Sequence, residues 1–382
     1  MSKAESRIKE VITFFENKDT FLGYRKLMDC IIDTQDLSLY KEVIALTDWK
    51  EKNPLEVERL IEKSLDFLNR ISKIPIEEYN TKKAVVIGTD LIKNYGYDRF
   101  TLGPISIKIH KGEVYGLVGE NGNGKTTLLR VLAQELSFNS GNLEFDLEIK
   151  HDNNYDLRSS LVYIPQRTKK WYGSLKDNLK FVLSSYNISP EENETRVLMM
   201  IARFGLWNYK HLKWNELSSG YKMRFELART LLRQPELLLL DEPLANLDVL
   251  AQQVILEDLK SICNSINNPI GLILSSQQLY EVEKISDKVI YLKNGKYKEN
   301  IGILEAENHL IVEIDCKCER DILKNAFSDL SLEKLVFNGG IYVVYFSLET
   351  SFSSVLEILG KHKIEVTYTR NITKSTRRFF VS

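Results

Sequence analysis

The sequence predicts a central α/β domain that is preceded by a small helical domain and followed by an α+β domain. Three observations support this organisation. Apolar residues recur with helical spacing up to about residue 80, strand and helix patterns alternate from about residue 84 to residue 300, and the tail has a β-α-β-β-α-β rhythm. We therefore expect domains at residues 1–80, 84–300 and 305–382.

The composition is that of a globular protein with nearly balanced charge. The chain has 382 residues, 43% of them hydrophobic, with 52 basic and 53 acidic side chains. Near neutrality argues against a nucleic-acid binder, because such proteins carry a strong positive field. Apolar runs are too short for a membrane helix, and the N-terminus lacks the apolar core of a signal peptide. The four cysteines make no disulfide framework, which favours a cytoplasmic location.

The N-terminal domain is expected to contain three or four short antiparallel helices and no chemical motif. Ile8, Val11, Ile12 and Phe15 follow the i, i+3, i+4, i+7 rule of an amphipathic helix. The segment Asn53–Glu56 resembles a helix start, since asparagine caps helices and proline is tolerated in the first turn. We predict a helical bundle that docks on another surface.

A phosphate-binding loop is predicted directly after the apolar strand at residues 113–118. The loop has the pattern G-x-x-x-x-G-K-[ST] between a strand and a helix. Its glycines allow backbone N–H groups to surround a phosphate, Lys125 would bind the β- and γ-phosphates, and the Thr126 hydroxyl would ligate Mg²⁺. An incidental glycine-rich turn is the structural alternative. The residues expected to bind nucleotide here are Gly119, Glu120, Asn121, Gly122, Asn123, Gly124, Lys125, Thr126 and Thr127.

An acidic pair follows a second apolar strand. Four leucines at residues 237–240 indicate a strand buried on both faces of a parallel sheet, and Asp241 and Glu242 stand at its carboxyl end, where such sheets bind ligands. We expect Asp241 to hold Mg²⁺ and Glu242 to polarise the attacking water. Adjacent carboxylates are also common at helix ends, so this prediction depends on the phosphate loop.

With these two motifs, residues 84–300 resemble the ATPase domain of ABC-type ATPases. The segment Leu217–Tyr221 is similar to the LSGGQ signature of the family, with Ser219 for the first glycine and Tyr221 for the glutamine. The resemblance implies a P-loop ABC ATPase domain with a mixed sheet and a helical subdomain. It also implies that Ser218, Ser219 and Gly220 form a helix N-terminus aimed at nucleotide bound by a partner subunit.

Three further residues are assigned through this resemblance. Gln166 matches the Q-loop glutamine, whose amide would ligate Mg²⁺ and sense the γ-phosphate; the adjoining residues 168–215 would meet a transmembrane partner. Tyr95 matches the aromatic residue that stacks on adenine. Asp248, in Ala245–Asp248, belongs to a segment that resembles the D-loop, which bridges the two nucleotide sites of a dimer.

Gln277 departs from the family, which usually has a histidine at this position. A neutral amide can donate a hydrogen bond to the γ-phosphate but cannot act as imidazole would. We therefore expect Glu242 to sustain hydrolysis at a lower rate than in relatives with the histidine.

The resemblance implies an ATP-hydrolysing transporter subunit that uses ATP and Mg²⁺. One loop and one signature per chain imply a head-to-tail homodimer, which acts on a separate integral membrane permease and lies peripheral to the inner (cell) membrane. The closing segment Thr367–Phe380 resembles accessory C-terminal domains of ABC-2 or multidrug exporters, which favours export. The sequence contains nothing that identifies the transported molecule.

Two other functions are compatible with the same motifs. One is a soluble ABC ATPase that acts on nucleic acid or the ribosome, although ribosome-associated relatives carry two cassettes in tandem and repair relatives carry long coiled coils, and this sequence has neither. The other is a slow-turnover, nucleotide-locked regulatory protein, which Gln277 and the N-terminal bundle would favour. We expect transport and no nucleic-acid partner.

Overall fold

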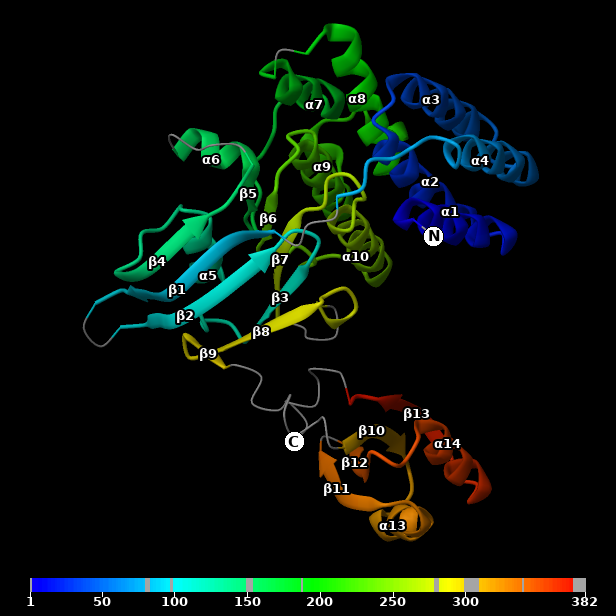
Figure 1. The fold of residues 1–382 in the computed structure, drawn as a ribbon, viewed down its shortest axis with the longest axis vertical. Coiled ribbons are helices and arrows are strands. Elements are labelled where there is room, and N and C mark those ends of the chain that lie inside the picture. The colour runs from blue at the N-terminus through cyan, green and yellow to red at the C-terminus, as the bar shows by residue number, and fades with distance from the viewer. Residues whose placement is uncertain are drawn as a thin grey trace.

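A mixed six-stranded sheet forms the centre of the molecule (Figure 1). The structure is a computed structural model that describes residues 2–79, 83–96, 99–148, 154–186, 188–277, 282–298, 309–338 and 340–373. The strand order in these residues is β5-β6-β7-β3-β8-β9, parallel except for the β8–β9 pair. The strands are β3 (Val114–Val118), β5 (Leu161–Ile164), β6 (Leu237–Leu240), β7 (Gly271–Ser276), β8 (Lys288–Lys293) and β9 (Lys296–Lys298).

The neighbouring strands β3, β6 and β7 place three predicted segments at one edge of this sheet. All four leucines of β6 are fully buried, as predicted for a strand covered on both faces. The phosphate loop follows β3, the acidic pair follows β6, and Gln277 follows β7. Because these strands are parallel, their carboxyl ends lie together, which brings the three segments to one site.

Further elements complete the central domain. An antiparallel sheet of order β2-β1-β4 adjoins the central sheet, and α5 follows the phosphate loop. Three helices, α7, α8 and α9, form a helical region, and each has a serine cap that accepts from the N–H three residues later. The bounds are β1 (Ala84–Asn94), β2 (Thr101–His110), α5 (Lys125–Leu132), β4 (Ser140–Phe145), α6 (Asn154–Ser160), α7 (Leu175–Ser184), α8 (Pro190–Arg203), α9 (Ser219–Leu231) and α10 (Val249–Cys263).

The described part of the N-terminal segment folds into four helices, which agrees with the prediction of three or four. They are α1 (Lys3–Glu16), α2 (Thr20–Thr34), α3 (Leu37–Lys52) and α4 (Val57–Ile71). The predicted helix start at Asn53 is wrong, because α4 begins only at Val57. Asn53 instead ends α3, where its backbone N–H and its side-chain amide both donate to the Trp49 carbonyl.

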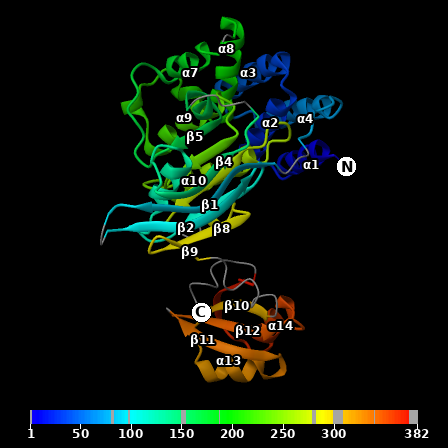
Figure 2. The same ribbon diagram turned by 60° about the vertical axis from the view of Figure 1, so that its left-hand side comes forward.

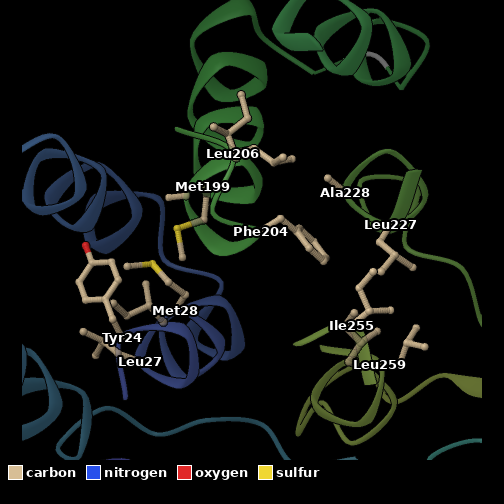
Figure 3. Close-up of a cluster of buried hydrophobic side chains, with 14 of the residues drawn as sticks. Tyr24, Leu27, Met28, Met199, Phe204, Leu206, Leu227, Ala228, Ile255 and Leu259 are labelled. Atoms are coloured by element: carbon tan, nitrogen blue, oxygen red, sulfur yellow. The ribbon is translucent and has the colours of Figure 1, made fainter. Parts of the chain in front are cut away.

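The N-terminal helices share one apolar core with the central domain. The core joins α2 to α8, α9 and α10 (Figure 3); its labelled residues are Tyr24, Leu27, Met28, Met199, Phe204, Leu206, Leu227, Ala228, Ile255 and Leu259. In Figure 1 and again in Figure 2, α3 lies beside α8. The surface on which the predicted bundle docks is therefore the chain's own central domain.

A buried ionic network crosses the same interface. Arg203, the last residue of α8, donates to Asp29 of α2 and to Asp258 of α10, each at 2.5 Å. Arg25 of α2 donates to both oxygens of Asp258. The side chains of Arg203 and Asp258 are each only 2% exposed, so charges with little access to water join three helices from different parts of the sequence.

The C-terminal segment has the predicted element order β-α-β-β-α-β. Its elements are β10 (His309–Cys316), α13 (Arg320–Ala326), β11 (Leu332–Asn338), β12 (Ile341–Ser347), α14 (Phe352–Lys361) and β13 (Val366–Asn371). The strands pair antiparallel in the order β11-β12-β10-β13. Across the described ranges of the whole chain, each helix is too short or too polar to cross a lipid bilayer.

Candidate functional site

The phosphate loop has the tight backbone that its glycines were expected to allow. Gly122 and Gly124 adopt φ values of 82° and 98°, a region that residues with a side chain rarely enter. A Cβ at Gly124 would also lie 2.7 Å from Cζ of Phe100. Directly after Gly124, α5 begins at Lys125, whose Nζ donates to the Gly119 carbonyl at 2.6 Å. The lysine ammonium therefore lies over the concave side of its own loop.

The other predicted loop residues lie around this lysine. Asn123 is buried, and its side-chain oxygen accepts from the Asn294 N–H at 2.9 Å, which ties the loop to the β8–β9 turn. Glu120, Asn121 and Gly122 form the exposed part of the loop, and Thr126 and Thr127 lie in the first turn of α5.

Asp241 is the centre of a cluster of hydroxyl donors. The Thr126 hydroxyl donates to its Oδ2 at 2.8 Å, and Ser275 Oγ donates to its Oδ1 at 2.8 Å. The Tyr163 hydroxyl donates to Oδ2 at 3.3 Å. Burial and the adjacent Asp241 carboxylate raise the pKa of Tyr163 above its ordinary value, so this phenol stays protonated at neutral pH.

Glu242 lies among three nitrogen donors. Nε2 of Gln166 is 2.8 Å from Oε2 of Glu242, and Nε2 of Gln277 is 3.0 and 3.1 Å from its two carboxylate oxygens. Lys125 Nζ lies 3.6 Å from Oε1. The structure thus brings together the residues predicted to be catalytic and the predicted phosphate-binding lysine.

The donor set around Thr126 suits a hard cation. A hydroxyl oxygen and the Asp241 carboxylate are the kinds of oxygen ligand that Mg²⁺ prefers. The side chain of Gln166, the third predicted ligand, contacts the neighbouring Glu242. Thr126 and Asp241 are already in contact, although they come from α5 and from the end of β6. The residues present therefore fit the predicted metal.

The signature segment lies at the N-terminus of α9. Ser218 is the exposed cap residue and accepts from the Tyr221 N–H at 3.5 Å, whereas Gly220 is buried. The Ser219 hydroxyl donates to the Asn246 carbonyl at 3.0 Å, which links the signature to the D-loop segment. Among the hydrogen bonds of the described residues, none joins Ser218 or Ser219 to the phosphate loop of the same chain.

Asp248 and Tyr95 lie on separate elements, before α10 and after β1. Asp248 caps α10 by accepting from the Ala251 N–H at 2.8 Å. Tyr95 follows β1 and is 43% exposed, with its ring centroid 6.5 Å from that of Phe100. Since Phe100 also borders Gly124, Tyr95 lies next to an aromatic residue that touches the phosphate loop.

Three residues of this site are absent from the sequence-based prediction: Phe100, Tyr163 and Ser275. Ser275 and Ser276 end an otherwise apolar strand at its ligand-binding edge, and this polar pair is a signal that could have identified Ser275. Tyr163 stands three residues before Gln166, on a strand adjacent to β6. Phe100 has no distinguishing signal, because aromatic residues are common where strands begin.

Comparisons with known proteins match the central part of the chain. The family model described as "ABC transporter" matches residues 102–245. A phosphonates import ATP-binding protein of Fusobacterium nucleatum is 31% identical over 237 residues, 56% of this chain and 93% of the relative. A lantibiotic transport ATP-binding protein of Streptococcus pyogenes is 32% identical over 210 residues, 54% of this chain and 86% of the relative.

A solved structure adds agreement at the level of the fold. The cbiO1 protein of Clostridium perfringens, described as part of the ABC transporter complex cbiONQ, superposes with a TM-score of 0.52 at 25% identity. The superposition covers 66% of this chain and 95% of that protein. The loop, the acidic pair and these relatives lead to one conclusion: the chain belongs to the family of ABC transporter ATP-binding proteins and is an ATPase.

Proposed function

We propose that this chain is the ATP-hydrolysing subunit of a transporter, in which ATP closes a homodimer and the closure drives a separate integral membrane permease. The observation that carries the proposal is the convergence of Lys125, Asp241 and Glu242 at one edge of the sheet. Such a site gives its open and closed states different affinities for the γ-phosphate, which is the requirement for a nucleotide-driven switch.

Each residue has a distinct part in this reaction. Lys125 and the N–H groups of the loop bind the phosphates, and Glu242 polarises the attacking water. Thr126, Asp241 and Gln166 are the residues that would hold Mg²⁺, which neutralises charge on the phosphates when it is bound. Tyr95 would stack on the adenine ring.

The surface beside the D-loop supports a dimer. Val249 and Leu250 follow Asp248 directly and are 76% and 75% exposed, although both are large apolar residues. Exposed apolar side chains gathered at one place are typical of an interaction surface. We assign this surface to a second copy of the chain, whose exposed Ser218 and nearby Gly220 would complete the nucleotide site.

Gln277→His should raise the ATPase rate at saturating ATP by about tenfold, which corresponds to about 1.4 kcal/mol of activation free energy. The Gln277 amide already contacts Glu242, and an imidazole at this position can also exchange a proton. Phosphate release by wild type and variant at equal ATP occupancy is the measurement. A variant no faster than wild type would remove the idea that Gln277 limits turnover.

A second exposed surface fits the permease. Tyr172 and Phe181, at the beginning and within the helical region, are 84% and 76% exposed. Affinity purification of the full chain from native membranes should recover an integral membrane protein, and Phe181→Ser should lose it while keeping the ATPase activity. Phe21→Ser, at a residue 57% exposed on α2, is the matched control. Recovery of ribosomes or RNA in place of a membrane protein would instead support a soluble ABC ATPase that acts on nucleic acid or the ribosome.

The names of the relatives favour transport over the two alternative functions, and we infer a location at the membrane surface through the permease. Export stays a prediction. It depends on the segment Thr367–Phe380, whose residues 374–380 lie outside the described ranges, and relatives for phosphonates, sulfate and methionine are named import proteins.

For the C-terminal domain, the strand order β11-β12-β10-β13 supports the ferredoxin-like plan.

A further inference from the structure

Ser275 lies between the two acidic residues of the site and bonds to both. Its side chain is fully buried near the end of β7, next to β6. The hydroxyl donates to Oδ1 of Asp241 at 2.8 Å and accepts from the backbone N–H of Glu242 at 2.9 Å. A serine hydroxyl has one proton to donate, and that proton is committed to Asp241.

The two oxygens of Asp241 therefore have different donors. Oδ1 accepts from Ser275, whereas Oδ2 accepts from Thr126 and Tyr163. Donors on both oxygens fix the rotation of a carboxylate, because any rotation would break at least one bond. Residues that orient a metal-binding carboxylate in this way contribute to metal affinity without touching the metal.

The bond to Glu242 acts on the backbone. Glu242 has φ of 48°, a left-handed conformation that non-glycine residues adopt only when their surroundings enforce it. Its N–H donates to Ser275 Oγ at 2.9 Å. The serine hydroxyl thus holds the turn that directs the Glu242 side chain toward Lys125, Gln166 and Gln277.

We propose that Ser275 is a positioning residue that sets the metal-binding carboxylate of Asp241 and the backbone of Glu242 at the same time. The proposal rests on the proposed roles of Asp241 in holding Mg²⁺ and of Glu242 in activating water. Two functions of the site are then separate. The loop binds the phosphates without Ser275, whereas holding the metal and activating the water both depend on Ser275.

The test uses the full chain with Ser275→Ala and Tyr163→Phe. Affinity for a fluorescent non-hydrolysable ATP analogue is measured in EDTA and across a Mg²⁺ titration, and phosphate release is measured separately. For Ser275→Ala, the Mg²⁺ concentration that gives half of the Mg²⁺ effect on affinity should rise by about 10- to 100-fold, and kcat should fall. The affinity for the analogue in EDTA should be unchanged. Tyr163→Phe, which loses only the longer bond, should show the same pattern to a smaller extent.

The control removes an equally buried hydroxyl elsewhere. Ser64 is fully buried in α4 and donates to the Leu60 carbonyl at 2.7 Å, so Ser64→Ala should leave both affinities and kcat unchanged. The proposal is overturned if Ser275→Ala keeps the wild-type Mg²⁺ dependence, or if its affinity in EDTA falls by the same factor as in Mg²⁺. Failure of the wild type itself to hydrolyse ATP would instead overturn the proposed function.

Discussion

Glu242→Gln is expected to slow ATP turnover by at least two orders of magnitude while ATP binding persists. The glutamine amide keeps the size of the side chain and one acceptor oxygen for Gln166 and Gln277, but it cannot take a proton from water. A positioned general base contributes about 10²- to 10⁴-fold to a rate, and kcat should fall by that factor. Phosphate release and retention of labelled ATP by the same sample are the two measurements.

Lys125→Ala is the matched variant for this experiment. The Lys125 side chain lies over the phosphate loop, and its removal takes away the full positive charge of the loop. We expect this variant to lose ATP affinity as well as turnover, in contrast to Glu242→Gln. If Lys125→Ala bound ATP as tightly as wild type, the assignment of the phosphate loop would be wrong.

Asp258→Ala is expected to be the most damaging substitution outside the nucleotide site. The variant would leave the guanidinium groups of Arg25 and Arg203 in the interior without the carboxylate they share. Removing one partner of a buried ionic network costs about 3–5 kcal/mol of unfolding free energy. The midpoint of urea unfolding measures the loss. Glu58→Ala, which removes an exposed ion pair with Lys18, should leave that midpoint unchanged, and equal midpoints for the two variants would contradict the account.

The same network predicts a loss of stability in acid. Burial opposes ionisation of Asp258, but Arg203 and Arg25 hold its pKa below the ordinary value. The ionised carboxylate therefore contributes stability above the pKa of an unfolded aspartate, about 3.9, and this contribution is lost as the pH falls through the lower native pKa. In Asp258→Asn, the free energy of unfolding should no longer fall over this pH range through Asp258. A variant whose free energy of unfolding depends on pH as in wild type would contradict this role of Asp258.

Local sequence patterns were sufficient for the phosphate loop and the acidic pair. The loop is nine consecutive residues whose glycines and lysine each have a chemical reason to be there. Its contact with Asp241 follows because β3 and β6 are parallel strands of one sheet, separated only by β7, so that their carboxyl ends lie at the same edge. The structure also has the predicted C-terminal element order, because each of those strands and helices has its own periodicity.

Contacts between distant segments were beyond prediction from the sequence. Ser275 of β7 contacts Asp241 at the end of β6, and Arg203 of α8 contacts Asp29 of α2 and Asp258 of α10. The local sequence around each of these residues does not indicate which residue it contacts. For the same reason, periodicity indicated helices before residue 80 but did not identify the surface on which they pack. The predicted helix start at Asn53 was wrong because this asparagine caps the end of α3, where its side-chain amide donates to the Trp49 carbonyl.

The central claim is that ATP is bound between two copies of this chain. Light scattering of Glu242→Gln on a sizing column, with and without ATP and Mg²⁺, measures it most directly. We expect a mass of 44.2 kDa without nucleotide and twice that mass with nucleotide. When Lys125→Ala is added to the variant, the mass should not change with nucleotide. A mass that stays at 44.2 kDa with bound ATP and Mg²⁺ would contradict it.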